Sequence, residues 1–149
     1  MRKILLALLG TMLATSVCFA AQEVRTIIDT TILSSTVTAA RGTAYIGDSE
    51  KTAFYVFYDE TQVDKILSAV VTIDTSVDNT NWTTASFRDY NGSSVSETLQ
   101  TAETIGVDGT YFCWFDEDLT LPYVRMNIAG TNLDTDDVIT VKAYLVEKK

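Results

Sequence analysis

The feature that most constrains the fold is a period-2 alternation of apolar and polar side chains over residues 67–74. Such alternation is typical of a strand that has one buried face and one face in solvent. The strand leads into a polar segment, residues 76–81, whose short side chains bond their own backbone and favour turns. Trp82 then begins a further extended run, so these residues predict a hairpin at the centre of a sheet.

Two later segments, residues 123–129 and 138–146, alternate in the same way. The apolar sides of the three segments predict one shared core, made of Leu67, Ala69, Val71, Ile73, Val124, Met126, Ile128, Ile139, Val141, Ala143 and Leu145.

Residues 53–58 (AFYVFY) are apolar at every position, which predicts a central strand that is covered on both faces. Asn91 and Gly92 tolerate the positive φ of a tight hairpin turn, so residues 95–101 are expected to pair with the strand before them. No window after residue 20 has a helical period, and turn residues separate about eight short strands. This pattern is typical of an antiparallel sandwich or barrel. We expect an all-β fold of two packed antiparallel sheets, a jelly-roll-like β-sandwich.

The N-terminus predicts export. A basic start over residues 1–3 and an apolar run over 4–14 precede Cys18-Phe19-Ala20, which places small residues where a signal peptidase cleaves. We expect residues 1–20 to be a signal peptide and residues 21–149 a single secreted domain, extracellular, periplasmic or bound at the cell surface. No later apolar run approaches the roughly 20 residues of a membrane-spanning helix, so no membrane insertion is expected.

The net charge and the residue types present limit the classes of function that the chain can have. The formal net charge is −9, which argues against nucleic acid as a partner, because nucleic-acid-binding domains carry a basic face. The chain has no histidine, the commonest general base and metal ligand, so we expect no enzyme, no catalytic residue and no cofactor. Cys113 would be the only cysteine left after signal removal, and its apolar surroundings predict burial.

One acidic run alternates oxygen ligands as calcium loops do. Its residues are Asn132, Asp134, Asp136 and Asp137. The run lacks the glycine and the bidentate glutamate that an EF-hand loop requires, so a solvated acidic turn is the alternative to a calcium site. Residues 116–118 are a second acidic group with less regular spacing.

Aromatic residues are the other candidate contacts, because exposed Trp and Tyr serve both sugar stacking and protein interfaces. The candidates for ligand contact are Trp82, Tyr90, Tyr123 and Tyr144. Both tryptophans lie within strand-like runs, however, so packing of Trp82 and Trp114 in the core is the competing interpretation.

The spacing Ser76-x-Asp78-x-x-x-Trp82, followed by residues 122–125 (PYVR) and the closing strand 138–146, resembles the pattern of discoidin-like domains. The resemblance implies a galactose-binding-like jelly roll, a fold that commonly binds glycans or lipid head groups. Small structural β-sandwich proteins of tailed phages have a similar pattern. Asn79 stands where the discoidin-like pattern has a glycine, and the family's pair of cysteines is missing, so no binding residue is carried over.

Together these features predict a secreted, non-enzymatic structural or adhesion module that acts through self-assembly or through contacts with other extracellular proteins. A carbohydrate-binding module of the discoidin-like type and a virion-type decoration protein are the alternatives. Residues 21–38 are rich in apolar side chains without a single alternation, so they would either join a neighbouring subunit or form the first edge strand of their own domain.

Overall fold

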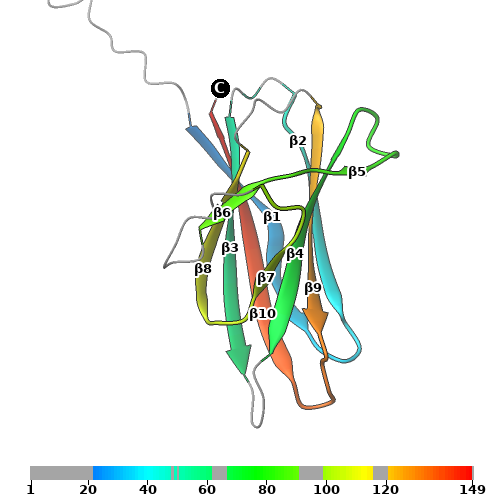
Figure 1. Cartoon of the computed structure of the whole chain (residues 1–149), viewed down its shortest axis with the longest axis vertical. Helices are drawn as coiled ribbons and strands as arrows, with labels where there is room; N and C mark the ends of the chain where they lie inside the picture. Colours follow the sequence, from blue (N-terminus) through cyan, green and yellow to red (C-terminus); the bar gives the residue numbers. More distant parts are fainter. Residues whose placement is uncertain are drawn as a thin grey trace, which may run out of the picture.

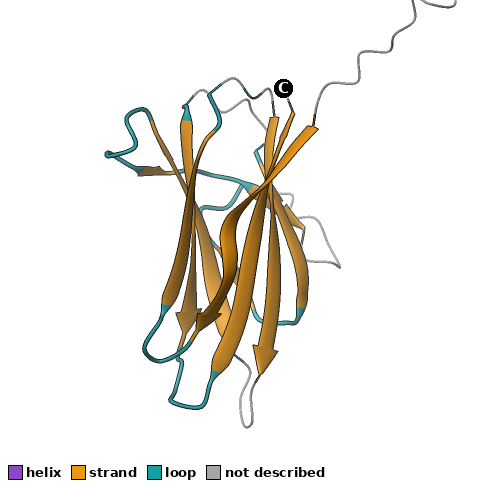
Figure 2. Ribbon diagram, turned by 180° about the vertical axis from the view of Figure 1, so that it is seen from behind, coloured by secondary structure: helices purple, strands orange, loops and turns teal. Residues whose placement is uncertain are grey.

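The computed structural model describes residues 22–47, 49, 51–61, 67–90, 99–115 and 121–148. Strands and loops make up these residues (Figure 2), and none of them forms a helix that could cross a membrane. The strands are β1 (Gln22–Leu33), β2 (Ala39–Tyr45), β3 (Lys51–Thr61), β4 (Ser68–Ser76), β5 (Thr83–Thr84), β6 (Arg88–Tyr90), β7 (Glu103–Ile105), β8 (Gly109–Trp114), β9 (Tyr123–Thr131) and β10 (Val138–Lys148).

The strands form two sheets that pack face to face (Figure 1). Sheet A has the order β1-β10-β3-β8-β6, and sheet B has the order β2-β9-β4-β5, with β7 also paired to β4. Every pairing is antiparallel. The predicted antiparallel β-sandwich is confirmed. Its described residues form ten strands instead of about eight, because β5, β6 and β7 are too short to leave a pattern in the sequence.

The core lies between the sheets, and the side chains predicted to share it are all at most 1% exposed. Neighbouring strands contribute Phe54, Val56 and Tyr58 from β3 and Phe87 from the segment before β6. Cys113 is buried among them, as predicted. The alternation along β4, β9 and β10 is therefore sufficient to define which side of these strands faces inward.

The prediction for residues 53–58 is half wrong. They form a central strand of sheet A, between β10 and β8, but only one of its faces is covered. Tyr55 and Phe57, which point away from sheet B, are 41% and 43% exposed. One apolar face of this strand therefore belongs to the core, and the other is an aromatic face exposed to solvent.

Residues 22–33 form β1, which pairs with β10 of its own sheet, so the edge-strand alternative for the N-terminal segment is confirmed. The register of β1 shifts between Thr26 and Ile28 and again between Ile28 and Thr31. Such bulges change which residues point inward and explain the lack of a single alternation. Gly42 allows β2 to approach β1 closely, because a Cβ at this position would lie 2.1 Å from the carbonyl oxygen of Ile27.

Several predicted features lie outside the described residues. They are the signal peptide 1–20, the turn at Asn91 and Gly92 with most of its partner strand, and the acidic group 116–118. Phe87 and Gln100, which flank the hairpin segment, pair antiparallel with each other.

A buried ion pair closes the end of the sandwich where β10 finishes. The side chain of Glu147 is 1% exposed, and Arg25 Nη2 donates to its Oε2 and to the carbonyl oxygen of Tyr45, the latter at 2.7 Å. Ser49 Oγ donates to the other carboxylate oxygen at 2.5 Å. Arg25 therefore links β1 and β10 of sheet A to the end of β2 in sheet B.

We expect Arg25→Met to lower the free energy of unfolding by about 3 kcal/mol, because it leaves the Glu147 carboxylate buried without its cation. This value is at the lower end for a broken buried pair, since the Arg25 side chain is 35% exposed. Urea unfolding measures the change. The control is Arg41→Met on the exposed side of β2. Equal losses in both variants would contradict the role assigned to the pair.

Candidate ligand-binding surface

The outer face of sheet A carries a row of aromatic side chains that crosses four strands in register. Tyr144 on β10 pairs with Tyr55 on β3, Tyr55 pairs with Phe112 on β8, and Phe112 pairs with Tyr90 on β6. Because residues directly opposite in a sheet point to the same side, all four rings project outward. With Phe57 and Trp114, which point the same way, they form what we call the aromatic face.

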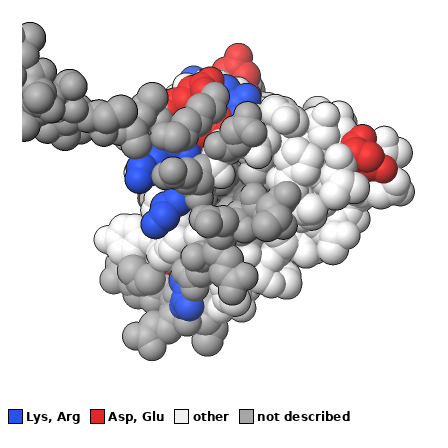
Figure 3. All heavy atoms as spheres, turned by 90° about the horizontal axis from the view of Figure 1, so that it is seen from above, with Lys and Arg blue, Asp and Glu red and all other residues white. Residues whose placement is uncertain are grey.

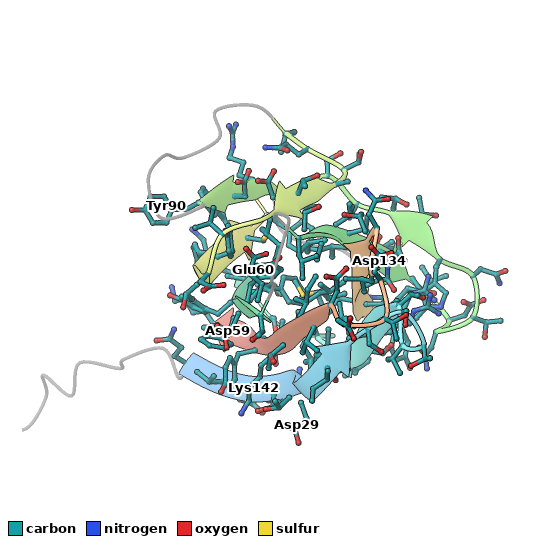
Figure 4. The ribbon with its side chains drawn as sticks, turned by 90° about the horizontal axis from the view of Figure 1, so that it is seen from below. Asp29, Asp59, Glu60, Tyr90, Asp134 and Lys142 are labelled. Carbon is teal, nitrogen blue, oxygen red and sulfur yellow. The ribbon has the colours of Figure 1, made fainter. Side chains whose placement is uncertain are left out.

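The rings of the aromatic face contact one another. The ring centroids of Tyr55 and Phe112 are 4.6 Å apart, and those of Phe112 and Trp114 are stacked at 5.4 Å with an interplanar angle of 24°. Tyr90 is 40% exposed and points away from the sandwich (Figure 4). The rings thus form a layer on the solvent side of the sheet rather than isolated surface residues.

Two hollows of about 460 and 440 Å³ lie on the aromatic face and meet at Tyr55. In the first, Ala53 pairs with Val146 on one side and Trp114 on the other, so the small alanine leaves a depression between two larger side chains. The second is lined by Phe57 and Tyr144 together with polar residues. The two hollows follow β3, and we call them the β3 groove.

Polar side chains line both ends of the β3 groove. Gln22, Lys51 and Lys148 line the first hollow, and Thr110 and Lys142 line the second. Aromatic surface and hydrogen-bonding groups therefore occur together along the groove.

Lys142 is placed beside the ring of Tyr144. Its Nζ lies 5.2 Å from the ring centroid and 3.9 Å from Oδ1 of Asp29. The hydrogen bond with Tyr144 is the main cause that raises the pKa of Lys142. The second hollow thus has an ion pair of Lys142 with Asp29 at its edge.

The structure does not bring the predicted ligand-contact residues together. Tyr90 and Tyr144 lie on the aromatic face, whereas Trp82 and Tyr123 lie on the side of sheet B. The Tyr123 ring packs edge-to-face against Tyr45 at 5.2 Å. The sequence interpretation did not select Tyr55, Phe57 and Phe112 as contacts, although the doubly apolar run 53–58 was a signal for the first two.

Neither tryptophan belongs to the buried core, so the interpretation of both as core residues is wrong. Trp114 lines the β3 groove. Trp82 packs under Arg125, whose guanidinium carbon lies 4.3 Å from its ring centroid. Arg125 also donates to Asp74 Oδ2 from Nη2 at 2.6 Å and from Nε at 3.1 Å, which holds the guanidinium over the ring.

The segment that carries the discoidin-like spacing forms a turn. Asp78 Oδ1 accepts the backbone N–H groups of Thr80 and Asn81 at 2.9 and 2.8 Å and the hydroxyl of Ser76 at 3.0 Å. The backbone hydrogen bonds from Asn81 and Thr80 hold the pKa of Asp78 well below its usual range. Asn79 has φ 60°, a conformation that glycine would also adopt. The spacing therefore encodes local structure in this chain.

The calcium candidates lie in the loop between β9 and β10. Asp137 is buried, and its Oδ2 accepts the backbone N–H of Asp134 at 2.6 Å while its own N–H donates to the Asp134 carbonyl at 3.2 Å. Asn132 begins the loop with φ 56°, and Asp136 is exposed. In the part of the chain that the structure describes, no three His, Cys, Asp or Glu residues gather to hold a metal ion.

Comparison with known proteins adds a similarity to solved structures. No protein-family model matches the chain, and no curated protein matches it. Among solved structures, the chain is similar to one described as the X-ray crystal structure of a carbohydrate-binding module specific for non-crystalline cellulose, CBM28. The two share 12% sequence identity with a TM-score of 0.42, over 80% of this chain and 70% of that chain.

A buried acidic cluster lies inside the sandwich behind β8. Asp89 is 3% exposed, and Gln100 Nε2 donates to its Oδ1 at 2.7 Å. Burial raises the pKa of Asp89. Burial is also the main cause that raises the pKa of Glu103, and the nearby carboxyl group of Asp89 raises it further. Burial, with these two carboxyl groups, also raises the pKa of Cys113 to about 12, so its thiol is inert at neutral pH.

Because the folded state favours the protonated form of Asp89, we expect stability to fall as pH rises. The contribution is fully present below the ordinary carboxyl pKa of about 4 and is lost as pH passes the raised value. Urea unfolding between acidic and neutral pH should show this decline, and Asp89→Asn should flatten it. The exposed-site control Asp136→Asn should keep the wild-type slope. An unchanged slope in Asp89→Asn would contradict the assignment.

Proposed function

We propose that the protein is an exported, non-enzymatic adhesion module that binds a polysaccharide strand in the β3 groove. The observation that carries the proposal is the in-register aromatic row, with polar groups at both ends of the groove beside it. An aromatic layer exposed over several strands is unusual for a protein that does not bind a partner through it.

Sugar rings match this surface chemically. Each pyranose ring has an apolar face of C–H groups and an edge of hydroxyl groups. The apolar face packs on aromatic rings such as Tyr55 and Trp114, and the hydroxyl groups exchange hydrogen bonds with Gln22, Thr110 and Lys142. The groove is open along β3, which suits a chain that continues beyond both ends.

The lining of the groove favours binding over hydrolysis. Glycoside hydrolysis uses two carboxyl groups on either side of the scissile bond, roughly 5 to 9.5 Å apart. Glu147 is the acidic residue among the described lining, and its carboxylate is occupied by Arg25 and Ser49. The groove residues thus support retention of a polysaccharide without its cleavage.

Association of two copies through the same face is a second candidate. Lys51 is the first outward residue of β3, and Asp59 lies near the other end of the same side. Two copies packed face to face with their strands reversed would therefore pair opposite charges at both ends. This arrangement would also suit self-assembly or a virion-type decoration protein.

We expect Tyr55→Ala and Trp114→Ala each to weaken polysaccharide binding about tenfold, because each removes a stacking ring from the groove. Binding to an array of polysaccharides and oligosaccharides, followed by calorimetry on the best ligand, measures the effect. The matched control is Tyr45→Ala, an exposed tyrosine on sheet B.

No binding by the wild-type protein, or equal losses in the control, would contradict the proposal. Elution as a dimer that Trp114→Ala converts to a monomer, without any glycan binding, would support self-association in its place. Circular dichroism of each variant checks that the strands remain intact.

A further inference from the structure

We propose that two copies of the chain pack face to face through sheet A when no polysaccharide is bound, so that each copy covers the β3 groove of the other. Binding of a polysaccharide then separates the pair. The pairing depends on the outer face of sheet A alone, whereas the opening step rests on the function proposed above.

The outward side chains of β3 are self-complementary in size about Tyr55. Ala53 lies two positions before Tyr55 and leaves the depression of the first hollow, and Phe57 lies two positions after it and is 43% exposed. A second copy can face the first with its strands reversed and the two-fold axis over Tyr55. Phe57 of each copy then lies over Ala53 of the other, so each large side chain meets a small one.

The outward residues of β8 have the same property. They are Thr110, Phe112 and Trp114, and Phe112 pairs with Tyr55 in register. The two-fold axis therefore runs along the aromatic row and places Trp114 of one copy over Thr110 of the other. Facing layers interdigitate when large side chains meet small ones, and sheets that pack in this way lie about 10 Å apart.

Aliphatic side chains on the same face favour a protein partner. Within the described strands, the large hydrophobic side chains that are exposed all lie on the outer face of sheet A, except for Tyr45. They include Val24 and Ile32 of β1, which are 61% and 57% exposed and pair with the outward Val146 and Thr140 of β10. Sugar rings stack on aromatic side chains, whereas a second copy also covers aliphatic ones.

The charges at the two ends of the face are compatible with the reversed arrangement. Figure 3, which looks down on the end where β3 begins, shows Lys and Arg side chains on the left-hand side, where Figure 1 places sheet A, with some Asp and Glu side chains beside them. Figure 4 views the opposite end and labels Asp29 and Asp59. The axis over Tyr55 brings Lys51 of one copy to Asp59 of the other, because each is four positions from it. Charge pairs of this kind add specificity and fix the register.

The second copy and the polysaccharide compete for one surface. Tyr55 and Trp114 line the β3 groove and lie inside the proposed interface, so only a separated copy binds the ligand. A ligand that binds one of two states shifts the equilibrium toward that state. The apparent affinity for the polysaccharide therefore falls as the protein concentration rises.

The first test exchanges the large and the small side chain and measures association by sedimentation velocity. Ala53→Phe places large side chains against each other and Phe57→Ala leaves a void, so each should weaken dimerisation about tenfold or more. The double variant Ala53→Phe/Phe57→Ala moves the large side chain to the other position. Because the faces then fit again, its association constant should return to within about threefold of the wild-type value.

The control variant is Ala39→Phe, which makes the same change on the exposed outer side of sheet B and should leave association unchanged. Circular dichroism of each variant checks that the strands remain intact.

The second test adds cellohexaose, or the tightest-binding oligosaccharide of the array, because a long polymer would tether two copies. We expect the bound oligosaccharide to convert the dimer to a monomer. The apparent affinity of the wild-type protein should fall about tenfold when its concentration is about a hundred times the dissociation constant of the dimer. Ala53→Phe, which is a monomer, should show no such dependence on concentration.

A wild-type protein that binds glycans and stays monomeric at every concentration would overturn this inference and leave the proposed function standing. A dimer that the double variant does not restore would overturn the face-to-face arrangement, and a dimer that persists with the oligosaccharide bound would overturn the covering of the groove. Restoration of the dimer without binding of any glycan would overturn the proposed function and the opening step together.

Discussion

The structure depends on the burial of one side of each long strand against the opposite sheet. In a pleated strand, successive side chains point to opposite faces. The residues buried in the core therefore determine which residues of the same strand point outward. On β3 the inward set is Phe54, Val56 and Tyr58, which are fully buried. The outward positions are released from packing between the sheets and are available for other interactions. The chain fills them with aromatic side chains on sheet A and mainly with polar ones on sheet B.

The inner face was predictable from the sequence because alternation is a local pattern. Residues 67–73, 124–128 and 139–145 each contain enough periods to identify the buried side without knowledge of the partner strand. The N-terminal strand was less predictable, since bulges near Ile28 interrupt its period and depend on the approach of Gly42 from the other sheet. Strands of two or three residues, such as β5, offer no period at all.

The outer aromatic face was harder to predict. An apolar residue in a strand, such as Tyr55 or Phe57, is either buried in the core or exposed on a binding surface. The residue type is the same in both situations, so the sequence does not distinguish them. The row also joins strands that are distant along the chain, because β10, β3, β8 and β6 become neighbours only through the sheet order. Short-range motifs were easy to recognise, but their function was not. The spacing from Ser76 to Trp82 was recognisable, yet it forms a turn and a cation–π contact with Arg125.

The cross-strand register of the aromatic row determines how it can bind. Tyr144, Tyr55 and Phe112 are attached to long strands whose backbones are fixed by hydrogen bonds on both sides, with the row completed by Tyr90 at the sheet edge. A ligand that meets such a surface does not need to order a loop, and rings already in mutual contact lose little side-chain freedom. Recognition on this face is therefore preorganised, so even shallow contacts can contribute most of their interaction energy to affinity.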